Sequence, residues 1–210
     1  MNQQHSPLIY LVDDDDAVRD ALALLLKSVG LRAEGFASPQ QFLAQHDRHG
    51  IGCVVLDIRM PGISGLDVLD TLSAASDLPV IMLTGHGNVD LCRRAFKSGA
   101  VEFLQKPVDD DLFLDAVQKA VRQHIGSRER QAATLAAREK LARLSGREQE
   151  VLQRIADGLS NKEIARELAL SPRTVETYRA NVFAKLEVDT LAQLIRHYLA
   201  LLPDGGGPPP

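Results

Sequence analysis

Three carboxylates directly follow two of the most apolar runs of this chain. These carboxylates are the strongest candidates for a chemical function. Asp57 directly follows the apolar residues 54–56, and Asp13 and Asp14 follow the apolar residues 8–12. Apolar runs of this length, bounded by turn residues, are typical of buried strands in a parallel sheet. A carboxylate at the end of such a strand costs free energy unless a cation or a donor binds it. We therefore expect a binding site here.

A hard divalent cation is the ligand that suits three adjacent carboxylates. If the two strands are parallel neighbours, Asp13, Asp14 and Asp57 share one pocket, and their repulsion requires a neutralising ion. Mg²⁺ binds oxygen ligands, keeps several water molecules and accepts a phosphate as a partner. The backbone carbonyl of Arg59 is a further candidate ligand. The acidic run 13–16 also suits a helix start, and its last two residues are expected to serve that role.

An ionised aspartate can accept a phosphoryl group and become an acyl phosphate. Phosphoryl transfer needs charge neutralisation and in-line positioning more than covalent chemistry from the protein. Thr84 ends the apolar run 79–83 and could donate a hydrogen bond to one phosphoryl oxygen, while Lys106 follows the run 101–104 and could pair with another. Either residue alone is more often an ordinary strand-end or surface residue. Their joint placement favours Asp57 as a phosphoryl acceptor.

Five strand–helix units are predicted within about the first 125 residues. The strands are expected at residues 8–12, 31–36, 53–56, 79–84 and 101–104, each followed by apolar residues at helical spacing. This alternation is typical of an α/β domain whose parallel sheet is covered on both faces. Right-handed crossovers place the carboxyl ends of all the strands on one side. The polar residues expected to meet there are Asp13, Asp14, Asp57, Thr84 and Lys106.

Composition limits the class of protein. The chain has 210 residues, of which 45% are hydrophobic and 25% charged, enough for two ordinary soluble domains. No apolar run reaches the roughly 20 residues needed to cross a bilayer, and the N-terminus does not resemble a signal peptide. Two scattered cysteines favour neither a disulfide framework nor a zinc site. We expect a cytoplasmic protein with reduced thiols.

Charge divides the chain into two halves. Residues 1–125 carry 17 acidic and 11 basic residues, whereas residues 126–210 carry 11 acidic and 13 basic residues, so the formal net charges are −6 and +2. An acidic module joined to a mildly basic one suggests a regulated domain attached to a domain that binds a polyanion.

From residue 144 the pattern changes to short helices. Ser145 and Glu148 predict a capping box, Ser160 caps the next helix, and Pro172 begins a third helix that is predicted to run to residue 186. Three short helices with a tight turn before the third are typical of a helix-turn-helix DNA-binding domain.

Two further segments flank this domain. Residues 126–143 are predicted to be a helical linker, either a solvated connector or a dimer-forming coiled seam. Residues 203–210 are rich in Gly and Pro and are expected to be disordered.

Candidate DNA contacts lie mainly on the third of these helices, where Val175, Val182 and Leu186 are predicted to face the core. The exposed residues are then available to bases or phosphates. Candidates for the groove are Glu176, Thr177, Ala180 and Lys185, candidates for phosphates are Lys162, Arg173 and Arg179, and Thr174 is a further candidate contact. The modest charge predicts weak, salt-dependent non-specific binding.

The first half resembles the receiver domain of two-component response regulators. The motifs are Val12-Asp13-Asp14, the segment 56–62, Thr84-Gly85 and Lys106-Pro107. The resemblance covers residues 6–125 and implies a flavodoxin-like (βα)5 fold with a five-stranded parallel sheet. It also implies that a partner histidine kinase phosphorylates Asp57, that Asp13 and Asp14 hold Mg²⁺, and that Thr84 contacts the phosphoryl group.

The same resemblance implies a switch. Phe103 is then the aromatic switch residue, and Pro107 is expected to follow a cis peptide bond. Thr84 would move toward the phosphoryl oxygens and free space for Phe103, which would change the surface of the fourth helix, fifth strand and fifth helix. This surface is expected to mediate dimerisation. His86 is placed to approach the acyl phosphate and tune its hydrolysis.

The second half resembles the LuxR-type DNA-binding domain. Residues 144–148, 158–165, 171–176 and 185–186 carry the resemblance, and the domain is expected to span 144–202. The chain departs from many family members at Tyr178, where they have His, and at Glu187, where they have Gly. The first difference affects contacts and the second affects a turn.

Together the two resemblances imply a phosphorylation-dependent transcriptional regulator and not an enzyme. It looks like the FixJ-like branch of the NarL/FixJ response regulators. It is expected to bind promoter half-sites in double-stranded DNA as a homodimer, with RNA polymerase as a further partner. Activation is expected rather than repression, because dimerisation couples naturally to two half-sites.

Two other functions fit part of the pattern. A phosphatase of the haloacid dehalogenase type would use Asp13 as its nucleophile, but it would leave Asp57 and the second half without a role. A receiver-like domain switched by a ligand would not need the complete acidic set. Phosphopeptide mapping separates a phosphatase from a response regulator, since it shows which aspartate is labelled.

Overall fold

The computed structural model describes residues 6–85 and 89–201. The chain forms two compact units, Met1–Glu129 and Arg130–Pro210, which we call the N-terminal unit and the C-terminal unit and describe separately. The predictions made for His86 and for a disordered tail at 203–210 lie outside the described residues. None of the described helices has both the length and the apolar composition that a membrane span requires.

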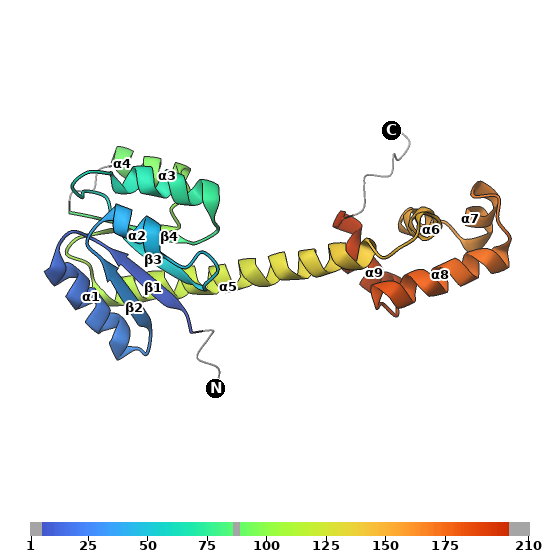
Figure 1. Cartoon of the computed structure of the whole chain (residues 1–210), viewed down its shortest axis with the longest axis horizontal. Coiled ribbons are helices and arrows are strands. Elements are labelled where there is room, and N and C mark those ends of the chain that lie inside the picture. Colours follow the sequence, from blue (N-terminus) through green and yellow to red (C-terminus); the bar gives the residue numbers. More distant parts are fainter. Residues whose placement is uncertain (1–5, 86–88, 202–210) are drawn as a thin grey trace. The chain divides into compact units, whose positions relative to one another are not determined.

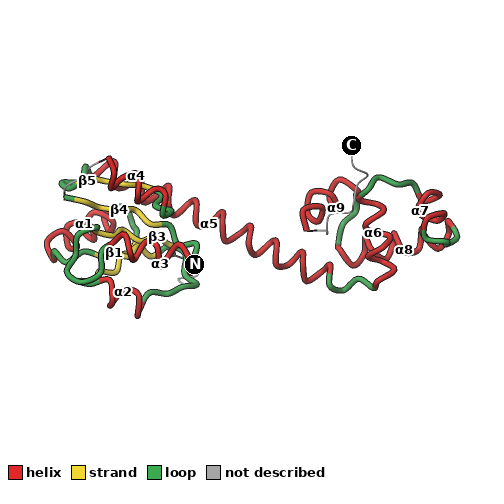
Figure 2. Tube along the Cα trace, turned by 90° about the horizontal axis from the view of Figure 1, so that it is seen from above, coloured by secondary structure: helices red, strands yellow, loops and turns green. Residues whose placement is uncertain are grey.

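The N-terminal unit contains a five-stranded parallel sheet with the strand order β2-β1-β3-β4-β5. Figures 1 and 2 show these strands side by side. The strands are β1 (Leu8–Val12), β2 (Arg32–Phe36), β3 (Gly52–Asp57), β4 (Val80–Thr84) and β5 (Glu102–Gln105). This is the flavodoxin-like order, in which ligands bind at the carboxyl ends of the strands. The predicted fold class is confirmed.

Helices cover both faces of the sheet (Figure 1). They are α1 (Asp16–Ser28), α2 (Pro39–Gln45), α3 (Gly65–Ala75), α4 (Val89–Lys97) and α5 (Asp110–Leu141). One apolar cluster joins α2, α3 and α4 to one face, and a second joins α1 and the first part of α5 to the other. Alternate residues of a strand point to opposite faces of the sheet, and helices cover both faces. All of β3 is therefore buried. That explains its continuous apolar sequence.

His124 of α5 is buried near the amino end of β3. Its Nε2 accepts a hydrogen bond from Arg128 Nε at 3.2 Å, and its Nδ1 lies 2.9 Å from the carbonyl oxygen and 3.2 Å from the amide nitrogen of Gly52. Arg128 also donates to the carbonyl of Arg48 at 2.7 Å and lies 3.4 Å from a carboxylate oxygen of Asp77. These contacts hold α5 against two loops of the N-terminal unit.

Replacing His124 with leucine is expected to destabilise the N-terminal unit by about 1–3 kcal/mol. The substitution puts an apolar side chain of similar size in this place, but it removes the imidazole contacts of the buried Gly52 backbone and one of the partners of Arg128. Urea unfolding of the full chain measures the effect. His49→Leu, at an exposed position of the α2–β3 loop, is the matched control. Equal stability of the two variants would contradict this assignment.

The C-terminal unit is helical. It contains α6 (Gly146–Ala156), α7 (Asn161–Glu167), α8 (Pro172–Leu186), α9 (Leu191–Tyr198) and a short 3₁₀ helix, Leu199–Leu201, together with the last turns of α5. Its apolar core takes residues from each α-helix. Ser145 and Glu148 form the predicted capping box at α6, and the predicted core residues of α8, Val175, Val182 and Leu186, are buried.

Candidate functional site

The three carboxylates predicted to share a pocket do so at the carboxyl ends of β1 and β3. Carboxylate oxygens of Asp13, Asp14 and Asp57 lie within 4.8 Å of one another. Asp13 is 3% exposed and Asp57 is 4% exposed, whereas Asp14 is exposed. Two nearly buried carboxylates and one open to solvent give a site that an ion or a phosphate can reach from outside.

The backbone of the β3–α3 loop holds the carboxylate of Asp57, the candidate phosphoacceptor, in place. The amide of Arg59 donates to Asp57 Oδ2 at 3.0 Å, so the β3–α3 loop folds back toward the carboxylate. A Cβ atom at Gly65 would lie only 2.1 Å from the Asp57 carbonyl oxygen, and glycine therefore allows α3 to begin close to β3. Gly62 in the same loop has φ +91, a conformation that favours glycine.

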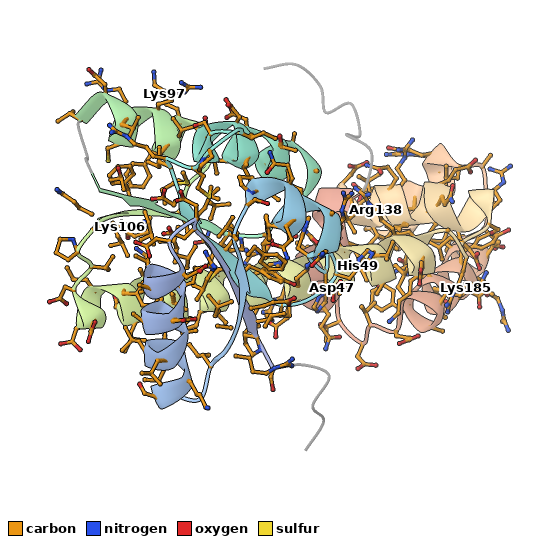
Figure 3. The ribbon with its side chains drawn as sticks, turned by 60° about the vertical axis from the view of Figure 1, so that its left-hand side comes forward. Asp47, His49, Lys97, Lys106, Arg138 and Lys185 are labelled. Carbon is orange, nitrogen blue, oxygen red and sulfur yellow. The ribbon has the colours of Figure 1, made fainter. Side chains whose placement is uncertain are left out.

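Lys106, labelled in Figure 3, follows β5 and reaches into this pocket. Its Nζ lies 2.5 Å from Asp13 Oδ2 and 3.0 Å from Asp57 Oδ1, so one ammonium group bridges two carboxylates. The amide of Lys106 donates to the carbonyl of Thr84 at 2.7 Å, which fixes the lysine backbone to the end of β4. The predicted association of Lys106 with the acidic pocket is thus present in the geometry.

Burial and the contacts between Lys106 and the carboxylates shift the pKa values of Asp57 and Lys106 in opposite directions. Burial raises the pKa of Asp57, and the hydrogen bond and charge of Lys106 offset only part of that rise. For Lys106, burial lowers the pKa, but the bonds to Asp13 and Asp57 outweigh it, so the pKa of the lysine is raised. The pocket therefore holds a protonated lysine beside an aspartate whose charged form is disfavoured by burial.

The remaining receiver candidates lie on β4 and β5. Thr84 is fully buried at the end of β4, and Phe103 is partly buried against the apolar cluster that contains α4. The peptide bond between Lys106 and Pro107 is cis, as the resemblance predicted. The Arg59 carbonyl as a ligand, and the switching roles of Thr84 and Phe103, stay predictions.

An open cavity lies next to the acidic pocket. It has a volume of about 650 Å³ and is lined by the β3–α3 loop, by Asp14 and by Leu91 and Arg94 of α4. Of the three carboxylates, Asp14 lines this cavity, which leaves it accessible from the solvent side.

Arg19 is a site residue that the sequence interpretation missed. Its Nη1 donates to the backbone carbonyl of Asp13 at 2.5 Å. The available signal was its position on α1, one helical turn after the acidic run 13–16, but nothing in the sequence shows that a guanidinium folds back over that run.

In the C-terminal unit, the predicted DNA contacts lie on α8 and α7. Arg173, Glu176, Thr177 and Ala180 are exposed on α8, Thr174 and Arg179 are half-buried, and Lys162 is exposed on α7. Several of these side chains have local partners. Thr174 Oγ1 lies 2.7 Å from Ser171 Oγ. Thr177 Oγ1 donates to the carbonyl of Arg173 at 3.1 Å, and the Arg179 guanidinium lies 6.0 Å from the ring centroid of Phe183. The first half of α8 thus presents a polar surface.

Lys185, a predicted DNA contact, has partners within the C-terminal unit. Figure 3 labels this residue, which lies near the end of α8, and its Nζ lies 2.6 Å from Glu148 Oε2 and 3.4 Å from the carbonyl of Arg143. Its ammonium group is therefore bonded within the C-terminal unit, joining α8 to the start of α6. Its role as a DNA contact stays a prediction.

The ion pair between Glu148 and Lys185 leads to a pH-dependent prediction. The Lys185 ammonium, followed by the Ser145 amide, lowers the pKa of Glu148, so the ionised carboxylate stabilises the folded unit. This contribution is complete above the unfolded pKa of about 4.3 and is lost as the pH falls through the lower folded value.

Glu148→Gln is therefore expected to lower stability at pH 7 by about 1 kcal/mol, because glutamine can still cap α6 but cannot pair with Lys185. Calorimetry of the full chain at pH 7 and at pH 3 measures the difference, which should shrink at the lower pH. Glu150→Gln, at an exposed position of the same helix, is the control. A difference that grows on acidification would refute the assignment.

Comparisons with known proteins agree with both units. Residues 9–118 match the family described as the response regulator receiver domain, and residues 142–198 match the bacterial regulatory proteins of the luxR family. The chain therefore belongs to the response regulators that join a receiver domain to a LuxR-type DNA-binding domain.

Within that class, the similar proteins are FixJ-like. The transcriptional regulatory protein FixJ of Bradyrhizobium diazoefficiens is 43% identical over 189 residues, covering 90% of this chain and 92% of that protein. FixJ of Azorhizobium caulinodans is 44% identical and covers 92% of each chain. The solved structure of the response regulator StyR matches with a TM-score of 0.83 and 38% identity, over 93% of this chain and 99% of that one. The protein is a FixJ-like transcriptional regulator.

Proposed function

We propose that a partner histidine kinase phosphorylates Asp57 and that phosphorylation converts the protein into a dimer that binds two promoter half-sites. In this proposal residues 6–125 receive the phosphoryl group, 126–143 form a linker, 144–202 bind DNA, and activation is the outcome. The observation that carries the proposal is the contact of Lys106 Nζ with both Asp13 and Asp57 beside a third carboxylate. This arrangement supplies both an acceptor and a fixed cation.

The donor set of the pocket fits Mg²⁺. Asp13, Asp14 and Asp57 offer oxygen ligands, with the Arg59 carbonyl as a further candidate, and a hard cation with retained waters suits that set. When bound, Mg²⁺ would neutralise charge on the carboxylates and on an incoming phosphoryl group. Burial, and to a smaller extent the charge of Asp13, raise the pKa of Asp57, and a bound cation would favour its ionised form.

Residues of the pocket have the remaining roles in phosphoryl transfer. The Asp57 carboxylate is the nucleophile, and the hydrogen bond from the Arg59 amide to Oδ2 orients it. The Lys106 ammonium can move from a carboxylate contact to a phosphoryl oxygen, and the Thr84 hydroxyl can donate to another. Phosphorylation thereby gives Thr84 and Lys106 new partners, and this is the differential interaction that a two-state switch requires.

In this proposal, DNA binding depends on α8. Its first half offers Arg173, Glu176, Thr177, Arg179 and Ala180 to DNA, with Thr174 and Lys162 beside them, and a second copy would place an identical surface on a neighbouring half-site. Because the C-terminal half has only a small positive charge, one copy is expected to bind weakly and two copies tightly. Dimerisation through the surface of α4, β5 and the first part of α5 would then control DNA affinity.

A DNA-binding measurement tests this proposal. A duplex selected from a random library by the phosphodonor-treated protein is titrated with the full chain, with and without acetyl phosphate and Mg²⁺, while sizing chromatography follows the oligomeric state. We expect treatment to increase both dimerisation and affinity. Equal affinity and equal size in both conditions would contradict the proposal.

A further inference from the structure

Each polar atom of Asp13 has a partner in the N-terminal unit. The carboxylate accepts hydrogen bonds from Lys106 Nζ and, at 3.0 Å, from the amide of Asp15. The Asp13 amide donates to the carbonyl of Phe36 at 3.2 Å. The Asp13 carbonyl lies one residue beyond the end of β1, where the strand ladder stops supplying donors. Arg19 Nη1 instead donates a hydrogen bond to the Asp13 carbonyl at 2.5 Å.

Arg19 is itself held in one conformation. Its Nη2 pairs with the carboxylate of Asp16 at the start of α1, and its side chain is only 15% exposed. The stem lies over Gly35 of β2, where an added Cβ atom would be 3.5 Å from Arg19 Cδ. A guanidinium is a planar group with donors in fixed directions, so these contacts fix the direction from which it binds the Asp13 carbonyl.

We propose that Arg19 is a positioning residue for the cation site: it holds the Asp13–Asp14 peptide so that both carboxylates point toward Asp57. The inference rests on the proposed function, in which this pocket binds Mg²⁺. Without Arg19, the Asp13 carbonyl loses this restraint and can turn toward water, and any such rotation moves the two side chains attached on either side of the peptide. Groups that orient metal ligands commonly contribute about tenfold or more to affinity.

Charge alone predicts the opposite effect. Arg19 places a positive charge beside a site for a cation, so removing it should strengthen Mg²⁺ binding if only Coulombic repulsion mattered. Positioning predicts that removal weakens binding. The direction of the change in Mg²⁺ affinity therefore separates the two accounts.

The experiment is calorimetric titration of the full chain with MgCl₂, which suits a protein that has no tryptophan to report binding. The variants are Arg19→Ala, Arg19→Lys and the control Arg32→Ala, which removes the same charge from an exposed position at the start of β2. We expect about tenfold weaker Mg²⁺ binding for both Arg19 variants. Lysine keeps the charge but cannot bond both the Asp13 carbonyl and the Asp16 carboxylate. The control is expected to match the wild type.

A second readout separates positioning from general damage. If Arg19 orients the ligands, the rate of phosphorylation by acetyl phosphate recovers at saturating Mg²⁺, while the Mg²⁺ concentration for half-maximal rate rises. Tighter or unchanged Mg²⁺ binding in Arg19→Ala would overturn the inference, as would wild-type binding by Arg19→Lys if the alanine variant fails to fold. If the wild type itself takes up no Mg²⁺, the proposed function fails as well.

Discussion

Replacing Asp57 with asparagine is expected to abolish the increase in DNA affinity and dimerisation that phosphodonor treatment produces. Asparagine has the same shape but its neutral amide cannot attack a phosphoryl group, so no acyl phosphate can form. The Arg59 amide can still donate to the side-chain oxygen, and Lys106 keeps its contact with Asp13. The variant should therefore fold. The duplex titration with and without acetyl phosphate measures the loss.

The matched control for this substitution is Asp70→Asn, an exposed position on α3 with the same change of charge. We expect this control to respond to acetyl phosphate like the wild type. If Asp57→Asn still gained affinity on treatment while remaining folded, Asp57 would not be the phosphoacceptor and the proposed switch would be wrong.

Lys106→Met is the second change with a large expected effect. Its ammonium group is the link between Asp13 and Asp57, and methionine leaves those nearly buried carboxylates to repel each other. Removing one partner of a buried charge cluster costs several kcal/mol, and we expect a loss of about 2–4 kcal/mol without divalent cations. Mg²⁺ should restore much of this stability, because it binds only the folded pocket.

Thermal unfolding of Lys106→Met with EDTA and with MgCl₂ measures both effects. Lys27→Met, an exposed position in the last turn of α1, is the control and should show a small effect that Mg²⁺ does not alter. The variant should also lose the phosphorylation-dependent gain in DNA affinity, since one contact that distinguishes the two states is gone. Wild-type stability without a divalent cation would contradict the electrostatic account of the pocket.

Much of the fold was predictable because buried segments have characteristic patterns of apolar residues in the sequence. The buried strands β3 and β4 appear as continuous apolar runs, and α8 begins and ends at the predicted residues. Strand β2 has a weaker pattern because most of its residues are not buried. Helix α5 continues without a break through Gly126 into the segment that the sequence predicted as a helical linker.

The acidic pocket was predictable for a different reason. Parallel strands bring their carboxyl ends together, so residues far apart in sequence could be placed in one site from topology alone. Topology does not show which donors fold back over a loop, and that is why the bond from Arg19 to the Asp13 carbonyl was missed. The bond from Lys185 to Glu148 was not predicted either, because the two residues lie on different helices.

Glu187 shows a further limit. It ends α8 with φ 55, the left-handed conformation that favours glycine, and its carboxylate pairs with Lys140 of α5 at 2.7 Å. The sequence indicated that a residue other than glycine occupies this turn, but not that its carboxylate pairs with a lysine of another helix.

The most direct test of the account is to locate the phosphoryl group. The full chain is incubated with acetyl phosphate and Mg²⁺, digested under acidic conditions that preserve acyl phosphates, and mapped by mass spectrometry. The account predicts a single labelled peptide that contains Asp57, and no label when Mg²⁺ is withheld. Label on Asp13 instead would indicate phosphatase-like chemistry, and it would contradict the central claim.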